Sequence, residues 1–460
     1  MGDLEATEHT RALGLLEAGD AVQARELLLS AVRDAVDPEL LNDLAVITAQ
    51  AGDVAAGADL LQALLALHPE HAAAAENLAA LGSLPPSGPG ASSAHGGTPP
   101  ANAGTDDRRP RFLQTIVDAV GTHLADNIDY LFEPWGRQLP DPAAAGERIA
   151  EQLNILDHAD TLWRSLGDEP SRSLLLRFLA YKALGPAHVR LQLDPSEYRR
   201  AVIGLSAAAL TNAAAVSLPG MPLEWQMHQY DMTKIGLPIS VIGPPLPLAS
   251  TMVLSQYGYR DPTIPARPGP GDVALDVGGC WGDTALWLAH MVGPEGRVHT
   301  FEPTPGNRGL LQRNLVLNPA LASRITVWDQ PLAPTAGETV WMPDVIAAGA
   351  ATQNGANHGN GHRMIELRTQ TIDAFVAQAE VPHVDFIKVD VEGADLGVLQ
   401  GAAHTIRRDR PRLALACYHK PDDLVTIPDF ISSLGIDYRW YLQCSTMTDV
   451  DTVAFGVPTS

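Results

Sequence analysis

Residues 272–292 read DVALDVGGCWGDTALWLAHMV, and this stretch decides the fold. An apolar run from Val273 predicts a β-strand that ends near Asp276. The turn GGCWG follows at 278–282, and the next run, which begins with Asp283 or Thr284 as its N-cap, predicts a helix. A strand, a glycine-rich turn and a helix are typical of α/β folds that bind nucleosides, because the turn brings backbone amides close to the ligand.

The next predicted strand, Arg297–Phe301, leads to Glu302, which lies 20 residues after Gly282 (302 − 282). An acid at this spacing accepts hydrogen bonds from the ribose hydroxyls of a nucleoside. The turn lacks the GxGxxG spacing of dinucleotide sites, and the charge of Asp276 at the strand end would repel a pyrophosphate. Both features favour S-adenosylmethionine, a sulfonium with an α-amino group, over NAD.

Strands and helices alternate through the rest of the chain. Such alternation predicts right-handed crossovers and a doubly wound, mostly parallel, seven-stranded sheet, preceded by α-helical domains. A Gly- and Asn-rich loop, 348–362, interrupts the pattern, and we expect it to be mobile. The seven predicted strands are Val273–Val277, Arg297–Phe301, Ile325–Trp328, Val384–Val389, Leu413–Cys417, Tyr438–Leu442 and Thr452–Phe455.

Four motifs appear in one order: DVGGCWGDTAL at 276–286, FEP at 301–303, FIKVDVEGADLGVLQGA at 386–402 and YHKPDDL at 418–424. Together they resemble the FkbM-type methyltransferase family, over about 200 residues from 267 to 456. The segment 171–259 is also similar to the upstream region of longer members. The resemblance implies a class I, Rossmann-like fold with S-adenosylmethionine as the methyl donor. It also implies O-methylation of a hydroxyl on a small molecule, such as a sugar, a macrolide or another secondary metabolite.

The resemblance also implies a set of cofactor-binding residues. Glu302 would hold the ribose, and Asp329, after the third strand, would reach the adenine amine. For Asp329 an exposed loop acid is the alternative interpretation. The full set is Asp276, Gly278, Gly279, Gly282, Asp283, Glu302 and Asp329.

Methyl transfer to a hydroxyl needs a general base or a metal ion that lowers the pKa of the acceptor. The fourth strand ends with Lys388, Asp390 and Glu392 on one face. The two carboxylates would bind Mg²⁺, or one would act as the base while Lys388 keeps it ionised. The alternative is a buried ion pair between Lys388 and an acid, with Glu392 capping the next helix.

The fifth strand leads to His419, which would accept a proton from the substrate; a structural role is equally expected. His228, Tyr230 and Tyr257 are expected near the substrate from their position alone. The catalytic candidates are therefore His419, Asp390, Glu392 and Lys388, with Asp390 and Glu392 also the candidate metal ligands.

The upstream chain divides into three parts by composition. Residues 1–82 are helical, and recurrences such as Gly52-Asp53 after Gly19-Asp20 resemble a tetratricopeptide repeat, with a generic helical hairpin as the alternative. Such a module offers a surface for a protein partner or for self-association. Residues 83–107 predict a flexible Pro/Gly/Ser linker. Residues 108–260 predict a mainly helical lid and substrate-binding region that begins with one apolar stripe over 112–124, and the Rossmann-like domain occupies 261–460.

Charge and composition exclude several classes of partner. The 54 acidic and 31 basic residues give a net charge of −23, which repels nucleic acid and anionic membrane surfaces. The three cysteines form no disulfide or zinc pattern, the N-terminus is acidic, and neither uncharged stretch is an uninterrupted membrane span. We therefore expect a soluble cytoplasmic protein, and the Ala-, Gly- and Arg-rich composition indicates a bacterial source.

Three other functions remain open from the sequence. The same fold would also support an N-methyltransferase, since an amine needs less help from a base. An interaction protein, with an inactive methyltransferase domain and functional helical repeats, would fail to bind the cofactor. A dehydrogenase is least favoured, because of the spacing in the glycine turn.

Overall fold

The computed structural model describes residues 71–82, 107–120, 145–211, 227–344 and 363–459, with isolated positions 42, 45, 46, 49, 54, 58, 61, 64, 65, 124 and 127. The repeat module expected in 1–82 and the linker expected in 83–107 therefore lie almost entirely outside the described residues. The loop 348–362 lies outside them as well. Helix α5 (Ala72–Gly82) is the described helix of the N-terminal module.

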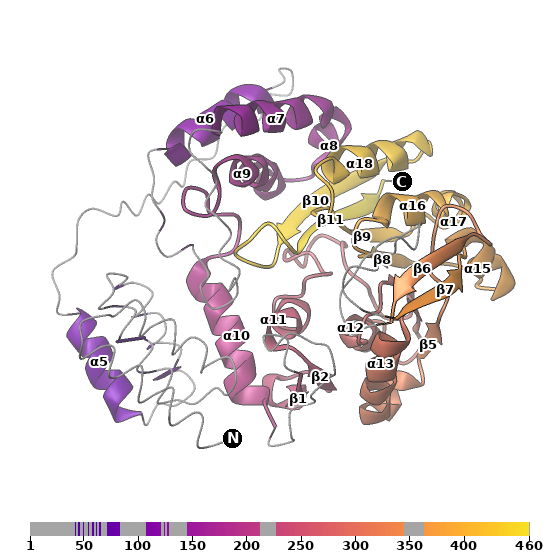
Figure 1. Ribbon diagram of the computed structural model, residues 1–460, viewed down its shortest axis with the longest axis horizontal. Coiled ribbons are helices and arrows are strands. Elements are labelled where there is room, and N and C mark those ends of the chain that lie inside the picture. The colour runs from indigo at the N-terminus through magenta and orange to yellow at the C-terminus, as the bar shows by residue number, and fades with distance from the viewer. Residues whose placement is uncertain are drawn as a thin grey trace.

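A seven-stranded sheet forms the centre of the molecule, in the order β10-β11-β9-β8-β3-β4-β5 (Figure 1). All neighbouring pairs are parallel except those of β11, which runs antiparallel to β9 and to β10. The expected α/β class with a mostly parallel sheet is confirmed. The strands are β3 (Val273–Val277), β4 (Arg297–Phe301), β5 (Ile325–Trp328), β8 (Phe386–Val389), β9 (Arg412–Ala416), β10 (Tyr438–Cys444) and β11 (Thr452–Pro458).

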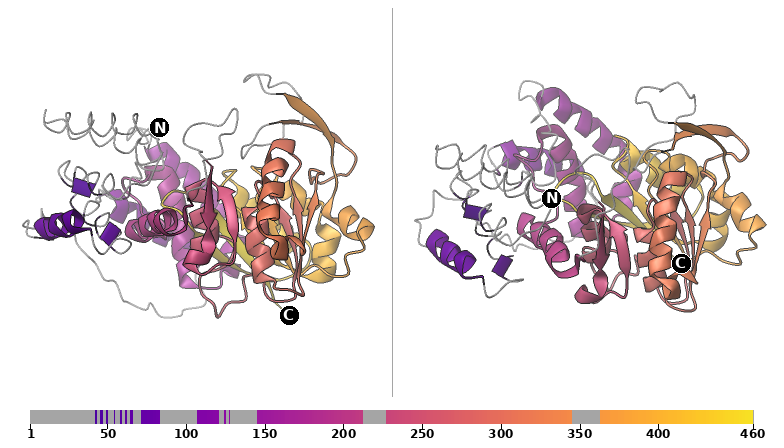
Figure 2. Two further views of the ribbon diagram at one scale, coloured as in Figure 1. Left: turned by 90° about the horizontal axis from the view of Figure 1, so that it is seen from below. Right: turned by 60° about the horizontal axis from the view of Figure 1, so that its bottom comes forward.

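Helices cover both faces of the sheet, and the alternation of strand side chains supplies one core on each face. Leu275 and Ile387 point into the first core, whereas their neighbours Ala274 and Phe386 point into the second. In Figure 2 the orange α13 and the gold helices lie on opposite sides of the strands. The first face carries α15 (Ile372–Gln378), α16 (Asp395–Gln400), α17 (Ala403–Asp409) and α18 (Asp423–Ser433); the second carries α10 (Pro195–Ala209), α12 (Asp283–Met291), α13 (Pro305–Leu317) and α14 (Pro319–Ala322). Within the described ranges, no helix has the length and apolarity needed to cross a bilayer.

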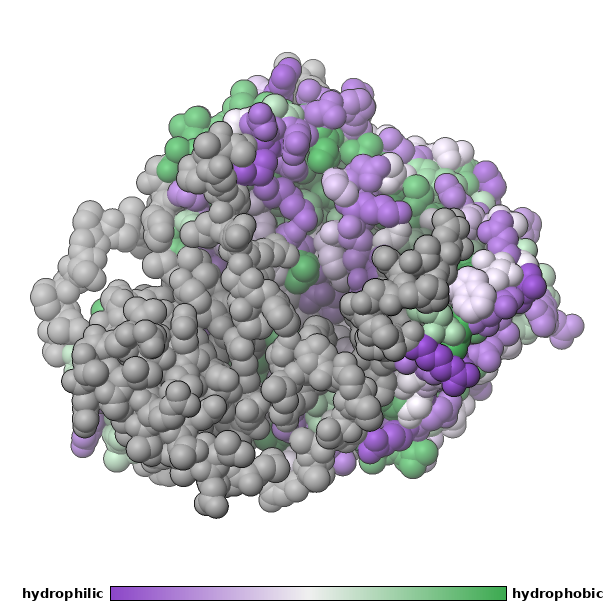
Figure 3. Space-filling view, viewed as in Figure 1, coloured by the Kyte–Doolittle hydropathy of each residue, from purple (hydrophilic) through white to green (hydrophobic). Residues whose placement is uncertain are grey.

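Four upstream helices share the first core with the sheet, so the boundary expected at residue 260 separates two sequence patterns but not two cores. They are α6 (Arg108–Val120), α7 (Ala145–His158), α8 (Asp160–Ser165) and α9 (Glu169–Leu184). The single stripe expected over 112–124 is wrong, because α6 buries Phe112 and Ile116 but exposes Leu113, Val117 and Val120. Apolar side chains are visible on the surface over α6 (Figure 3).

The outer edge of β10 is bonded to the chain around α8, α9 and α10. The N–H of Gly167 donates to the carbonyl of Trp440 at 2.7 Å. The N–H of Leu442 donates to Ser171 Oγ at 2.9 Å, and the N–H of Cys444 donates to Gln192 Oε1 at 3.0 Å. The backbone groups on this edge therefore have partners within the chain.

The segment before β3, in the region expected to be mainly helical, also contains a β-hairpin. A hairpin of β1 (His228–Asp231) and β2 (Ser240–Gly243) packs beside α13, and the side chains of Asn314 and Asn318 accept from the N–H groups of Ile242 and Ser240 at 2.7 and 2.8 Å. Short helices complete this segment: η4 (Met232–Ile235), α11 (Pro245–Leu248) and η5 (Ala249–Val253). A second hairpin, of β6 (Thr339–Pro343) and β7 (Met364–Arg368), was not predicted, because no short turn signal joins its strands.

A substitution in the shared core tests whether the upstream helices and the sheet unfold together. Leu175 of α9 is fully buried, and we expect Leu175→Ala to lower the free energy of unfolding by about 2–5 kcal/mol. Leu113→Ala on α6, where the side chain is 44% exposed, is the matched control and should change it by less than about 0.5 kcal/mol. Urea unfolding followed by circular dichroism and tryptophan fluorescence checks both. An early transition of the helices alone would contradict a shared core.

Candidate active site

A cavity of about 620 Å³ opens at the carboxyl ends of β3, β4 and β8. Ligands of doubly wound folds bind at this edge, and the volume suits a small molecule. Its walls come from the glycine turn, the start of α13, the segment 246–257, the loop after β8 and the turn between β10 and β11. Residues as far apart in sequence as Tyr198 and Asp451 therefore face one space.

The glycine turn at 278–282 has a backbone that only glycine fits at two points. Gly278 has φ +90°, and a Cβ there would lie 1.9 Å from the carbonyl oxygen of Asp390. A Cβ on Gly279 would lie 2.1 Å from Thr300 Oγ1. Gly282, with φ +86°, ends the turn directly before α12. The N–H groups of Gly278 and Gly279 donate to the carbonyl of Phe301, so the turn packs closely against β4 and its backbone borders the cavity.

Glu302 and Asp283 both line the cavity beside this turn. Glu302 accepts from the backbone N–H of Cys280 at 2.9 Å and of Thr304 at 2.8 Å. Burial raises the pKa of Glu302 despite these hydrogen bonds. Burial also raises the pKa of Asp283 to about 6, although its carboxylate accepts a hydrogen bond from Thr251 at 3.1 Å. Both expected cofactor-binding acids therefore face the space where a ligand would lie.

Asp276 and Lys388 form a buried ion pair at 3.2 Å between β3 and β8, with side chains 0% and 2% exposed. Thr284 and Thr300 donate to the same carboxylate at 3.1 and 2.8 Å. Asp276 lies beneath the turn and does not line the cavity, where we had expected it to contact the cofactor. Lys388 does line it, and its Nζ also donates to the carbonyl of Gly278 at 2.6 Å. The buried ion pair that was the alternative for Lys388 is thus present.

The charge of Lys388 is favoured by its neighbours. Burial opposes a charge on its ammonium, but the carboxylates of Asp276 and Asp390 outweigh burial and raise the pKa of Lys388. The same ammonium lies 5.2 Å from the ring centre of Tyr257. Lys388 therefore stays charged and does not act as a base.

Asp329 lies exposed after β5, outside the residues that line the cavity. The next residue, Gln330, does line it. A neighbouring position therefore takes the place that the sequence assigned to Asp329.

The loop after β8 is organised by one buried carboxylate. Asp395, 1% exposed, accepts from the N–H of Val391 at 3.1 Å and of Gly393 at 3.0 Å. The loop takes left-handed backbone conformations at Glu392, with φ +54°, and at Gly393, with φ +92°. A left-handed glutamate is strained, and such strain gathers at functional sites. Glu392 and Asp390 are both held at the cavity by this loop.

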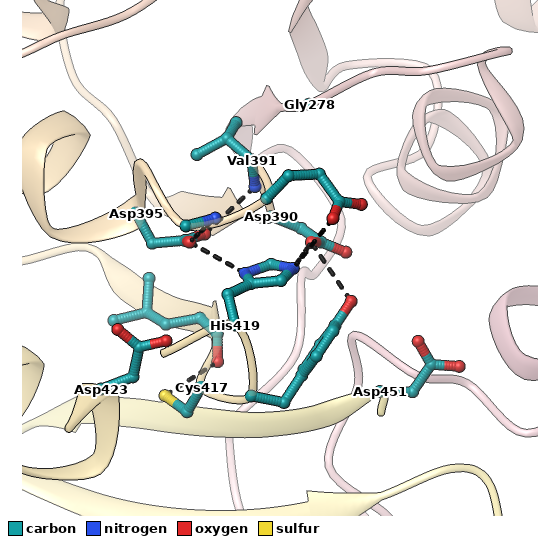
Figure 4. A network of polar contacts seen from close by, with 12 residues as sticks. Gly278, Asp390, Val391, Asp395, Cys417, His419, Asp423 and Asp451 are labelled. Carbon is teal, nitrogen blue, oxygen red and sulfur yellow. Dashed lines mark hydrogen bonds and ion pairs between the residues drawn. The ribbon is translucent and has the colours of Figure 1, made fainter. Parts of the chain in front are cut away.

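His419 completes the cluster from the other side of the loop (Figure 4). Its Nδ1 lies 2.9 Å from Asp395 Oδ2, and its Nε2 lies 3.3 Å from Asp390 Oδ1 and 3.8 Å from Glu392 Oε2. The side chain is only 6% exposed. Three of the four catalytic candidates, Asp390, Glu392 and His419, are thus brought together.

The electrostatics of His419 change its expected role. Burial opposes a charge on the ring, but the hydrogen bond to Asp395 and the negative charges of Asp390, Asp395 and Glu392 raise the pKa of His419 to about 9. A ring that is protonated at neutral pH has no lone pair to accept a proton, so the free base expected at His419 is wrong for this arrangement. The same surroundings would attract any other cation.

Two tyrosines missed by catalytic reasoning bond to Asp390. Tyr257, which we expected near the substrate, donates its hydroxyl to Asp390 Oδ2 at 2.6 Å. Tyr418 donates to Oδ1 at 3.4 Å, and both rings line the cavity. His228 and Tyr230, which we also expected near the substrate, lie on β1 and do not line the cavity.

Asp451 is the cavity acid that we did not predict. It lies directly before β11, with φ +61°, and its Oδ1 accepts from Gln256 Nε2 at 2.9 Å. Burial, reinforced by the charges of Asp390 and Glu392, raises the pKa of Asp451 to about 7. The strand direction could have predicted Asp451. Because β11 is antiparallel, the residue before it lies at the same edge as the carboxyl ends of the parallel strands.

Part of the C-terminal half of the chain is similar to known proteins. Residues 269–438 match the model of the methyltransferase FkbM domain. The hexuronic acid methyltransferase AglP of Haloferax volcanii is 29% identical over 136 residues, which cover 30% of this chain and 52% of that protein. The chain thus spans about half the length of this relative.

Two solved structures are also similar to parts of this chain. The methyltransferase FkbM from Methylobacillus flagellatus is 21% identical, with 67% of this chain and 60% of that chain covered and a TM-score of 0.40. The fibrillarin of Aeropyrum pernix, solved with bound S-adenosyl-L-methionine, is 13% identical, with 53% and 100% covered and a TM-score of 0.30.

Removing one partner of the buried ion pair should be costly. Lys388→Met leaves the carboxylate of Asp276 buried without its cation, and we expect it to lower the free energy of unfolding by about 3–5 kcal/mol. The matched double variant, Asp276→Asn with Lys388→Met, removes both charges and should recover most of that loss. Urea unfolding of the three proteins measures the difference. Equal stability of wild type and Lys388→Met would show that the pair has no such role.

Proposed function

We propose that the FkbM methyltransferase domain carried by residues 269–438 transfers a methyl group from S-adenosylmethionine to a hydroxyl oxygen of a small molecule. The observation that carries this proposal is the cavity itself. The glycine turn with Asp283 and Glu302 borders one part of it, and the cluster around Asp390 and Asp451 borders another. A donor and an acceptor would therefore meet within one cavity.

The charge of the cavity supports a cationic cofactor. Among the described lining residues, five are acids and one is a lysine: Asp283, Glu302, Asp390, Glu392, Asp451 and Lys388. The sulfonium and ammonium groups of S-adenosylmethionine outnumber its carboxylate, so this lining attracts it and repels the pyrophosphate of NAD. Glu302 is the acid that would bind the ribose hydroxyls, and Asp283 would lie near the amino acid part of the cofactor.

Asp451 is the group that we assign as proton acceptor. When bound, S-adenosylmethionine supplies the electrophile: its sulfur–methyl bond breaks as the oxygen–methyl bond forms, and S-adenosylhomocysteine leaves. The proton of the acceptor hydroxyl passes to the carboxylate of Asp451, whose raised pKa makes it a better base than an ordinary aspartate. Tyr257 and Tyr418 hold Asp390 in place and present their rings to the acceptor. A divalent cation at Asp390 and Glu392, Mg²⁺ in the sequence prediction, would lower the pKa of the hydroxyl further.

The acceptor that fits this lining is a neutral hydroxylated compound, such as a sugar, a glycoside or a macrolide. The name of the Haloferax relative specifies a hexuronic acid. Here the carboxylate of such an acid would meet Asp390, Glu392 and Asp451, and like charges in a partly buried site repel strongly. An amine acceptor is the second candidate, because the same acids favour a cation. Methylation that survives loss of Asp451 would favour it.

Cofactor binding is the first test. Calorimetric titration of the full chain should give a micromolar dissociation constant, about −8 kcal/mol. Glu302→Gln removes the charge that would accept from the ribose and should weaken binding at least tenfold, about 1.4 kcal/mol. Glu295→Gln, at an exposed acid after α12, is the control and should leave binding unchanged. If S-adenosylmethionine gives no heat and no thermal shift, the domain is inactive and the N-terminal helices become the functional part.

The role of Asp451 predicts a pH profile. Because a protonated Asp451 cannot accept a proton, kcat/KM for an acceptor identified by screening should rise through pH about 7 and level off above it. Asp451→Asn should lower the plateau about 10²-fold and abolish the rise. Asp429→Asn, at an exposed acid of α18, should keep both. A rise that persists in Asp451→Asn would assign it to another group, of which Asp390, Glu392, Tyr257 and Tyr418 face the same space.

A further inference from the structure

His419 turns the paired carboxylates of the cavity into a three-sided cluster. One atom each of Asp390, Glu392 and His419 lies within 4.8 Å of the others. Acids alone gather at many protein surfaces without a ligand. A nitrogen buried with them, pointing into the space that they share, is the feature that needs an explanation.

The orientation of the ring is fixed from behind. Asp395 accepts from Nδ1 at 2.9 Å, and its own position is set by the N–H groups of Val391 and Gly393. Nδ1 therefore donates to Asp395, and Nε2, the atom that faces Asp390 and Glu392, would give up its proton when a metal ion binds. A carboxylate behind a histidine in this way is the usual support of a metal-binding imidazole.

Nε2 has no hydrogen-bond partner, although the side chain is only 6% exposed. It lies 3.3 Å from Asp390 Oδ1 and 3.8 Å from Glu392 Oε2, without the alignment that a hydrogen bond requires. Buried polar atoms in proteins nearly always have a partner, so this nitrogen calls for one.

A divalent cation fits the spacing of these three atoms. Ligands bound at about 2.1 Å lie about 3.0 Å apart at a right angle and about 3.4 Å apart in a tetrahedron. The 3.3 Å separation matches, and Glu392, whose side chain is 39% exposed, has room to close the longer one. Asp390 Oδ1 is the oxygen that can bind the cation, because the hydroxyl of Tyr257 donates to Oδ2.

We propose that Asp390, Glu392 and His419 form a binding site for one first-row transition-metal dication such as Mn²⁺, supported by Asp395 and open to the cavity. One nitrogen and two carboxylates suit Mn²⁺ or a similar ion better than Mg²⁺, which prefers oxygen ligands. His419 is then a metal ligand in place of the base that the sequence suggested. The site rests on the geometry alone; only its use, to bind and acidify the acceptor hydroxyl, rests on the proposed function.

The test uses the full chain, freed of any affinity tag and treated with a chelator, with MnCl₂ as the probe. Electron paramagnetic resonance should count one bound Mn²⁺ per chain, and pulsed spectra should show coupling to an imidazole ¹⁴N. His419→Gln should weaken binding at least tenfold and abolish the ¹⁴N coupling. Asp390→Asn should weaken binding to a similar extent. A tenfold excess of Mg²⁺ should leave most Mn²⁺ bound.

The chain contains a matched control. His383 also lies between two aspartates, with its nitrogens 3.3 Å from Asp385 and 3.3 Å from Asp409, but its side chain is 52% exposed. His383→Gln should leave Mn²⁺ binding and the ¹⁴N coupling unchanged. Loss of both in His383→Gln, or their retention in His419→Gln, would overturn the assignment.

S-adenosylmethionine titration of the same samples separates this proposal from the proposed function and checks folding. The His419→Gln protein should bind the cofactor and melt at the wild-type temperature to within a few degrees. Mn²⁺ binding without cofactor binding would leave the metal site standing and remove the methyltransferase proposal. Cofactor binding with no Mn²⁺ bound by the wild type would overturn the metal site and leave the enzyme.

Discussion

Lys388 and Asp276 meet between the two central strands of the sheet, and much of the site is built around their contact. Two charges without access to water are tolerated only where each is paired and hydrogen-bonded. Here two threonines complete the shell of the carboxylate, and the ammonium reaches the carbonyl of Gly278. The pair therefore fixes the start of the glycine turn relative to β8, and through β8 the loop that carries Asp390.

Around this ion pair, several acids lie close together at the carboxyl edge of the sheet. Burial raises the pKa of Asp283, Glu302, Glu392 and Asp451, and like charges raise it further at Asp283, Glu392 and Asp451. Such clustering costs stability unless a cation relieves it. In the functions proposed above, two cations would relieve this repulsion: the sulfonium of the cofactor at one end of the cavity and a metal ion at the other. The left-handed backbone of Glu392 stores further strain in the same place.

The fold and half of the site could be predicted because their signals are local. Strand periodicity, the glycine turn and the spacing to Glu302 depend on neighbours in sequence, and the seven expected strands all form. Strand-end position placed Asp390 and His419 at the cavity edge. The period of two did not apply to Asp390 and Glu392, because β8 ends at Val389 and the loop turns left-handed at Glu392. The predictions that failed, or could not be made, depended on contacts between elements far apart in sequence. The partner of Lys388 comes from β3, 112 residues earlier (388 − 276), and the pKa of His419 depends on three carboxylates whose directions no spacing reveals. To predict Asp451 at the cavity, one must know that β11 runs antiparallel. To predict the buried face of α6, one must know which side of that helix packs against α7 and α9.

The bonded edge of β10 has a consequence for any attempt to isolate the domain. The matched segment 269–438 ends where β10 begins, so a fragment cut there would lose both final strands and Asp451. A longer fragment that began at 267 would keep the strands, but Trp440, Leu442 and Cys444 would lose Gly167, Ser171 and Gln192 as partners. An unpaired strand edge is a template for another chain. The chain before the domain thus caps the edge strand β10 and prevents one copy of the sheet from pairing with the next.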